Sequence, residues 1–172
     1  MKNLVIVFYN AGFAGDLISA LINPNVFLKF SNGRVILKDD VWLLKDINNR
    51  TKWTIQQKKD YIKKITQTYN VCSSHDIEMA LLYKNNTLLP YCSDVNLLKK
   101  FHKRFKKYAP QQKTTFEEML DQQNINCKIF KNKVDLKKIF VGDILSELKL
   151  KKTHKRINLL KTWKKINSDI VI

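Results

Sequence analysis

Two of the four glycines in this 172-residue chain lie three residues apart in one short loop. The loop separates an apolar run at residues 4–9 from the apolar residues 17–22. Glycine permits tight turns and lets a ligand approach the backbone closely. Backbone N–H groups in such a loop, with the positive end of a following helix, favour a bound phosphate. The candidate phosphate-binding residues are Asn10, Ala11, Gly12, Phe13, Ala14 and Gly15. The alternative is an ordinary turn that needs glycine for its geometry alone.

The residues after the second glycine argue against ATP or GTP hydrolysis. A Walker A motif places Lys and Ser/Thr there, to hold the terminal phosphates and magnesium. Asp16 and Leu17 occupy these positions in this chain. An acidic side chain repels a phosphate unless it points away, and Asp16 suits the N-cap of the following helix.

A second candidate for chemistry is the pair His75 and Asp76, which follows a short apolar run at residues 71–74. Histidine titrates near neutral pH, so His75 at the end of a strand is suited to act as a general base. Asp76 would orient its ring. The alternative is a loop histidine that caps or packs. His102 and His154 lie among lysines, and we expect them to be solvated.

Hydrophobic patterning predicts the elements that position these residues. We expect strands at residues 4–9, 71–74, 88–92 and 127–130, and a hairpin or irregular excursion within 26–47 around Asn32-Gly33. We expect helices at residues 17–22, 54–69, 77–83, 94–107, 115–122 and 144–150. A last helix carries a stripe of Ile157, Leu160, Trp163 and Ile166, which should pack against the rest of the domain. Strands that alternate with helices predict parallel pairing and a layered α/β fold.

Composition sets the class of protein. The length suits one α/β domain (1–172), with a core at about 1–130 and a helical C-terminal part at about 134–172. No apolar stretch is long enough to span a bilayer, and the apolar start reads as a buried strand rather than a secretion signal. Cys72, Cys92 and Cys127 match neither a disulfide framework nor a zinc site, so we expect reduced thiols in a cytoplasm-like compartment.

The formal net charge of +17 favours polyanionic partners, although the preference of the chain for Lys, Asn and Ile suggests that part of it is compositional. Two stretches are strongly basic: Lys99–Lys107, which holds six Lys and Arg residues, and Lys149–Lys165. Each could bind nucleic acid or another polyanion, or be a solvated helix surface. No known DNA- or RNA-binding motif is present, so such binding would be insensitive to sequence.

The order of these motifs resembles the sulfotransferase-like branch of the P-loop fold, including its small phage and marine-virus members. The matching segments are residues 4–22, Ser73-Ser74-His75-Asp76, residues 88–104 with Ser93, Asp94 and Arg104, residues 134–143, and finally Trp163 and Asn167. The chain departs from the family where the loop lacks its basic residue and its Ser/Thr.

The resemblance implies a three-layer P-loop-like fold, with a short parallel sheet flanked by helices and a helical C-terminus. It also implies that PAPS (3'-phosphoadenosine 5'-phosphosulfate) or adenosine 3',5'-bisphosphate binds the glycine loop, Ser93 and Arg104. His75 would be the base for transfer to an unknown hydroxyl or amine, with no metal, in the cytoplasm or, for a viral protein, that of the host cell. The alternative is a non-enzymatic, basic nucleic-acid-binding protein, again of viral type. A nucleotide kinase is disfavoured because the Walker lysine is missing.

Overall fold

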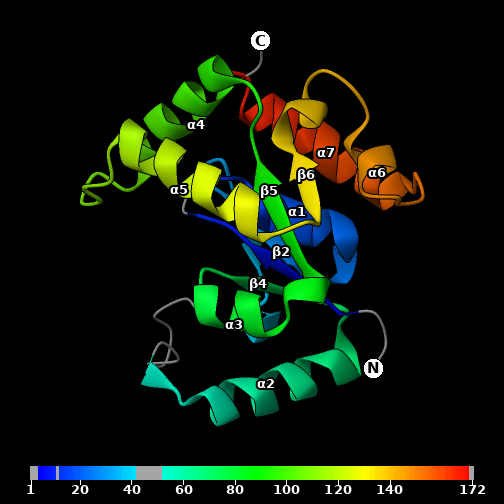
Figure 1. Ribbon diagram of the computed structural model, residues 1–172. Coiled ribbons are helices and arrows are strands. Elements are labelled where there is room, and N and C mark those ends of the chain that lie inside the picture. Colours follow the sequence, from blue (N-terminus) through cyan, green and yellow to red (C-terminus); the bar gives the residue numbers. More distant parts are fainter. Residues whose placement is uncertain (1–3, 11, 42–51, 171–172) are drawn as a thin grey trace.

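A four-stranded parallel sheet lies at the centre of the computed structural model, which describes residues 4–10, 12–41 and 52–170 (Figure 1). Its order is β4-β1-β5-β6, where β1 is Val5–Phe8, β4 is Val71–Ser74, β5 is Thr87–Tyr91 and β6 is Lys133–Asp135. Val7 lies opposite Ser73 of β4 and Leu88 of β5. The sheet confirms the predicted layered α/β fold.

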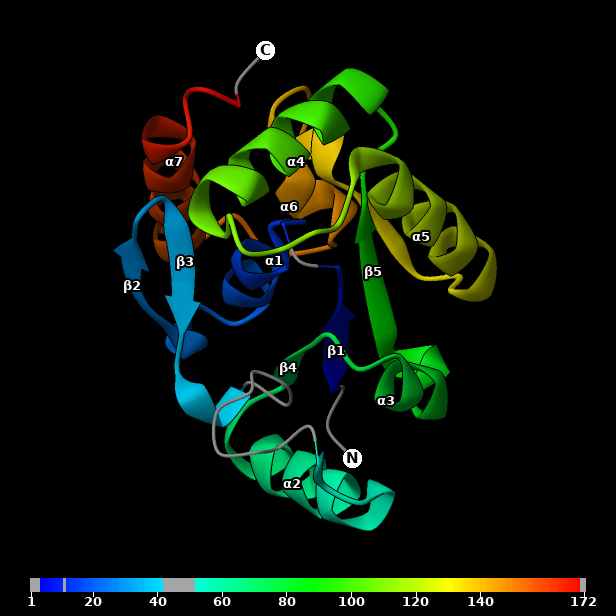
Figure 2. The ribbon, with the colours of Figure 1, turned by 90° about the vertical axis from the view of Figure 1, so that its left-hand side faces the viewer.

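Helices cover both faces of the sheet. They are α1 (Gly15–Ile22), α2 (Ile55–Thr68), α3 (Ile77–Leu82), α4 (Val95–Tyr108), α5 (Phe116–Ile129), α6 (Ile144–Glu147) and α7 (His154–Ile166), with short 3-10 turns at Pro24–Val26, Asp39–Val41, Lys84–Asn86 and Leu136–Ile139. An antiparallel hairpin of β2 (Phe27–Ser31) and β3 (Arg34–Leu37) lies beside α1 and α7 (Figure 2). None of the helices in the described residues is long and apolar enough to cross a membrane.

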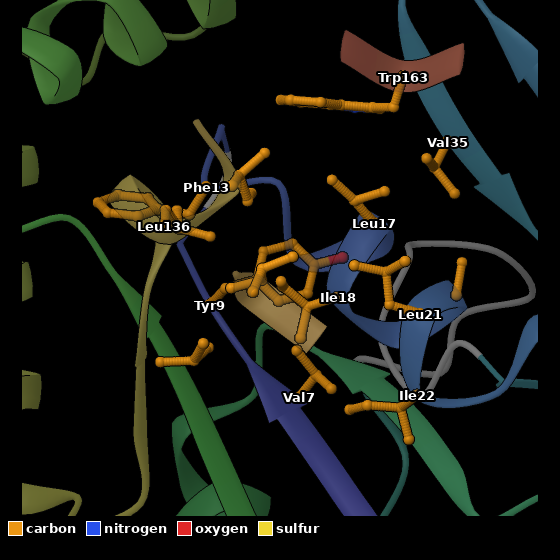
Figure 3. Packing of buried hydrophobic residues seen from close by; sticks show 14 of the residues in the cluster. Val7, Tyr9, Phe13, Leu17, Ile18, Leu21, Ile22, Val35, Leu136 and Trp163 are labelled. Carbon is orange, nitrogen blue, oxygen red and sulfur yellow. The ribbon is translucent and has the colours of Figure 1, made fainter. Parts of the chain in front are cut away.

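The two faces of β1 feed separate parts of the core because successive side chains of a strand point in opposite directions. Val7 joins the largest cluster, with α1, the hairpin and Trp163 of α7 (Figure 3). Ile6 packs with α2 and Met79 of α3 on the other face, where Phe8 contacts Phe130. This burial on both faces explains why residues 4–9 form an unbroken apolar run.

Capping and turn residues mark the ends of several helices and strands. A capping box opens each of two predicted helices, at Thr54 before α2 and at Thr115 before α5. Asn32 and Gly33 have φ values of 48° and 75°, the left-handed pair that a tight two-residue hairpin turn requires. Lys149 also has a positive φ, 54°, and the chain leaves α6 at Glu147 instead of continuing to residue 150.

Two predictions of elements are wrong. Residues 127–130 are not a strand, because α5 continues to Ile129 and the fourth strand is β6, whose three residues are too few to show a period. The last helix does not bury its three-residue stripe as a whole. At 3.6 residues per turn, Ile157 and Ile166 lie on opposite sides of the helix, and Ile166 is 42% exposed. The buried residues of this helix are instead Leu159 and Trp163, and Asn167 and Ile170 are buried in the turn that follows it.

Candidate functional site

A cavity of about 370 Å³ lies at the carboxyl ends of β1 and β4. Its walls come from the glycine loop and the start of α1, from β3, from α4 and the loop after it, and from α7. β1 lies between β4 and β5, and ligands of open α/β sheets bind outside the carboxyl ends of the strands where the order reverses. The lining includes Gly12, Gly15, Arg34, His75, Arg104 and Tyr108.

The two loop glycines are required by close packing. Gly12 has a φ of 95°, and a Cβ atom there would lie 3.0 Å from the Cβ of Phe105 on α4. A Cβ on Gly15 would lie 2.0 Å from Cδ1 of Tyr9. The glycines therefore let α4 and the Tyr9 ring approach the loop, and this packing alone accounts for both of them.

Asp16 is not the N-cap of α1, contrary to the sequence prediction. Ala14 holds that position with a φ of 42° and makes no side-chain cap. The Asp16 carboxylate, in the first turn, accepts hydrogen bonds from the Tyr9 hydroxyl and, at 3.4 Å, from Ser73 Oγ. Burial and the Asp16 charge raise the pKa of Tyr9 well above its usual value, so its hydroxyl stays protonated and donates. A carboxylate thus already offsets the positive end of this helix.

Positive charge enters the cavity from two arginines. Arg104 lies on α4; its Nη2 donates to the Gly33 carbonyl, and its Cζ lies 5.2 Å from the Tyr108 ring and 5.7 Å from the Trp163 ring. Its buried Nε has no hydrogen-bond partner among the described residues. Arg104 also forms no ion pair with any of these residues. Burial lowers the pKa of Arg104. A hydrogen bond with Tyr108 and the Asp169 carboxylate oppose this shift, and the charge of Arg34 adds a smaller lowering.

Arg34 was missed by the sequence prediction. It is the first residue of β3, directly after the hairpin turn, and no motif marks it. The turn is anchored because the Gly33 carbonyl also accepts a hydrogen bond, 3.1 Å long, from Nδ2 of Asn167. This anchoring holds Arg34 at the edge of the cavity.

His75 is exposed at the carboxyl end of β4, as predicted. Its Nδ1 is hydrogen-bonded to the Tyr9 carbonyl, and the two rings meet edge to face with centroids 4.6 Å apart. A carbonyl oxygen only accepts, so Nδ1 carries the proton. The neutral ring then has its acceptor lone pair on Nε2, the form that a general base requires.

Asp76 does not orient His75. Its carboxylate caps α3 through the backbone N–H groups of Glu78 and Met79, and it pairs with the buried Lys58 at 2.7 Å. Orientation of His75 comes from the Tyr9 carbonyl instead. We therefore assign Asp76 a structural role.

The structure separates some of the predicted phosphate-binding residues. Ser93 donates from Oγ to Asp135, 2.5 Å away, and its N–H also binds that carboxylate, so it joins the ends of β5 and β6 and does not line the cavity. Phe13 is in the core, 2% exposed, and Ala11 is outside the described residues. The cavity therefore retains Gly12, Ala14, Gly15 and Arg104 of the predicted set.

A second cavity of about 310 Å³ adjoins the first. Both are lined by Tyr9, His75, Phe105 and Gln112, so His75 lies where they meet. The remaining lining of the second cavity is uncharged: Asn10, Thr114, Met119 and Gln122. The first cavity is thus lined by two arginines, by Asp16 and by aromatic rings, and the lining that belongs to the second cavity alone is neutral and rich in amides.

The other histidines and the acidic residues do not form a further site. His102 is half-buried and its Nε2 lies 3.0 Å from the Thr114 carbonyl, so the prediction that it is solvated is wrong; His154 is exposed. The described part of the chain contains no cluster of His, Cys, Asp and Glu suited to a metal ion.

Comparisons with protein-family models, with curated proteins and with solved structures find no match.

Proposed function

We propose that the chain binds a phosphorylated nucleotide in the first cavity and acts as a group transferase of the sulfotransferase type. Arg104 carries this proposal. Its guanidinium is largely buried and forms no ion pair within the described residues, so Tyr108 and the more distant Asp169 offset its desolvation only in part. An anionic ligand beside Arg104 and Arg34 would supply the missing partner, and arginine binds phosphate through paired hydrogen bonds.

The aromatic lining supports a nucleotide over a simple anion. Phe105 and Tyr108 line the cavity on α4 and are only partly buried, and Trp163 forms part of its wall. Aromatic rings stack on nucleobases, and the volume of the cavity lies within the range of small-molecule sites. PAPS and adenosine 3',5'-bisphosphate combine a purine with two charged ends, which fits two arginines and a wall of rings.

The second cavity supports transfer rather than binding alone. A neutral acceptor with a hydroxyl or amine would lie there, and His75 at the junction would take its proton on Nε2. The sulfuryl group would pass from the phosphosulfate to the acceptor oxygen or nitrogen, and adenosine 3',5'-bisphosphate would leave. Positioned acid–base groups of this kind contribute about 10²–10⁴-fold to rate.

We also place the protein in a reducing compartment such as the cytoplasm. Cys72, Cys92 and Cys127 form no disulfide. Burial raises the pKa of Cys92 to about 12, so this thiol is unreactive at neutral pH.

Thermal-shift titration with adenosine 3',5'-bisphosphate tests the proposed binding, with ATP and a short DNA duplex as comparisons at low and high salt. A ligand that binds only the folded state raises its stability by mass action, and we expect the bisphosphate to do so at both salt concentrations. Stabilisation by the duplex alone, lost at high salt, would contradict a nucleotide site in the cavity.

His75→Ala is expected to bind the bisphosphate as the parent does, because Arg34 and Arg104 are unchanged. Release of bisphosphate from PAPS in the presence of an acceptor should fall by about 10²-fold or more. His154→Ala is the matched control, because His154 is exposed on α7 and contacts Asn158 rather than the cavity. Unchanged turnover in His75→Ala would exclude His75 as the base.

A further inference from the structure

The positive charge of the chain is concentrated in two segments, residues 95–114 and 148–168. Together they contain 15 of the 32 Lys and Arg residues and none of the 15 acidic residues. The rest of the chain therefore carries 17 cations against 15 acids and is close to neutral. A general drift of composition towards lysine would have spread the excess over the whole chain. The localisation indicates a surface with a function.

Both segments lie at one end of the molecule. Residues 95–114 form α4 and the loop after it, and residues 148–168 form α7 and the loop before it. Figures 1 and 2 both show α4 and α7 at the carboxyl end of the sheet, with α2 at the opposite end. The two helices meet where Arg104 of α4 lies over Trp163 of α7, in the wall of the first cavity. We call these two segments the basic end.

Many cations of the basic end are presented to solvent. Lys99, Lys103 and Lys107 are exposed on α4 at four-residue spacing, which puts them on one side of the helix in steps of about 6 Å. Lys161 and Lys165 repeat this spacing on α7. Other cations have structural roles.

Two such cations are in the second basic segment. Arg156 caps the end of α1 through the carbonyls of Leu21 and Ile22. Lys152 pairs with Asp143 at 2.5 Å. The surface that remains for a partner is therefore mainly a set of lysines.

We propose that the basic end binds the phosphate backbone of a nucleic acid, which lies along the exposed lysines of α4 and α7. At 3.6 residues per turn, Lys99, Lys103 and Lys107 lie on the side of α4 away from Phe105, which lines the first cavity. The lysines would therefore bind phosphates on the outer side of the helices, and contacts of this kind do not depend on the base sequence. This interaction goes beyond the nucleotide site and needs no transfer reaction.

The burial of the two helices disfavours an anionic membrane as the partner. A helix that lies on a membrane inserts its apolar face into the lipid. The apolar faces here are already used, because Leu98 and Phe101 of α4 and Leu159 of α7 are buried in the core. Val95 and Ile166 are the large apolar side chains that these helices expose, one on each. A single such residue does not make an inserting face.

The test measures binding of a labelled single strand of about 15 nucleotides by fluorescence anisotropy across a salt series. The variant Lys99→Gln/Lys103→Gln/Lys107→Gln should weaken binding by about tenfold or more at low salt. It should also reduce the slope of log K against log salt by about 2, because each phosphate contact with a single strand contributes about 0.7. Glutamine preserves most of the length of each side chain, so we expect the helix to remain intact.

The control removes the same charge at the opposite end of the molecule, in Lys59→Gln/Lys63→Gln/Lys64→Gln on α2. We expect this triple variant to bind the strand nearly as the parent does. Equal weakening by both triple variants would show that binding depends on net charge alone, and this would overturn the proposal. The proposal would also be overturned if the protein bound phosphatidylserine vesicles more tightly than the strand and the α4 variant lost this vesicle binding. Bisphosphate binding is measured separately, so the two proposals can fail independently. Loss of bisphosphate binding alone contradicts the nucleotide site, and loss of strand binding alone contradicts the basic end as a nucleic-acid surface.

Discussion

Arg104→Met is expected to abolish stabilisation by adenosine 3',5'-bisphosphate, while the free protein becomes as stable as the parent or more stable. Each lost hydrogen bond to a charged group contributes about 1.5–3 kcal/mol, which corresponds to a roughly 10- to 100-fold weaker affinity. In the absence of ligand, the substitution removes a partly desolvated cation that forms no ion pair with the carboxylates in the described part of the chain. Apolar replacements of such buried charges are often neutral or stabilising. The Gly33 carbonyl still accepts a hydrogen bond from Asn167, so the hairpin remains anchored.

The matched control for Arg104 is Arg156, an arginine whose hydrogen bonds are structural. Its Nε, Nη1 and Nη2 donate to the carbonyls of Leu21, Lys151 and Ile22 at 2.7, 3.2 and 3.0 Å. Arg156→Met should lower the free energy of unfolding by about 1–3 kcal/mol, because it leaves carbonyls at the end of α1 without donors. Ligand affinity should not change.

Chemical denaturation and the thermal shift with bisphosphate give opposite patterns for the two arginine variants. The Arg104 variant loses ligand binding and keeps stability, and the Arg156 variant loses stability and keeps ligand binding. Parent-like affinity in Arg104→Met would contradict the role of this guanidinium in the site.

The sequence predicts the fold where local signals act alone. Residues 4–9 are apolar at every position because both faces of β1 are covered, and the capping boxes at Thr54 and Thr115 need only their own neighbours. His75 is predicted at the carboxyl edge because it directly follows β4. Each of these inferences needs only a pattern within a few consecutive residues, even where the packing behind the pattern is long-range.

Inference from the sequence fails where contacts with distant segments determine the position of a side chain. Asp16 suits an N-cap by its position, but the Tyr9 and Ser73 hydroxyls draw its carboxylate away. Arg34 lines the cavity at the end of a hairpin turn that is hydrogen-bonded to Asn167 and Arg104, which lie far from it in the sequence. Asp76 follows His75 directly but binds Lys58 of α2. The resemblance to sulfotransferase-like proteins suggests Arg104 by its position in the sequence, but the Tyr108 and Trp163 rings beside its guanidinium are known only from the structure.

Gly15→Ala is expected to destabilise the protein by about 3 kcal/mol or more, at the upper end of the range for overpacked cores. The new Cβ would lie 2.0–2.2 Å from three ring atoms of Tyr9. The ring is buried, and its hydroxyl is hydrogen-bonded to Asp16 and to Ser73, so it has little freedom to move aside. For a chain of this size, such a loss corresponds to a fall in Tm of about 6–12 °C.

Two further variants separate packing from phosphate binding as the reason for Gly15. Ala14→Gly, at the neighbouring residue with a φ of 42°, should change stability by less than about 1 kcal/mol, because relief of the left-handed strain offsets the greater freedom of the unfolded chain. In a Tyr9→Ala background the clash is absent, so Gly15→Ala should then cost little, and the double-mutant cycle should show strong coupling. If Gly15→Ala instead keeps parental stability and loses only bisphosphate binding, this glycine is present for the ligand and not for Tyr9.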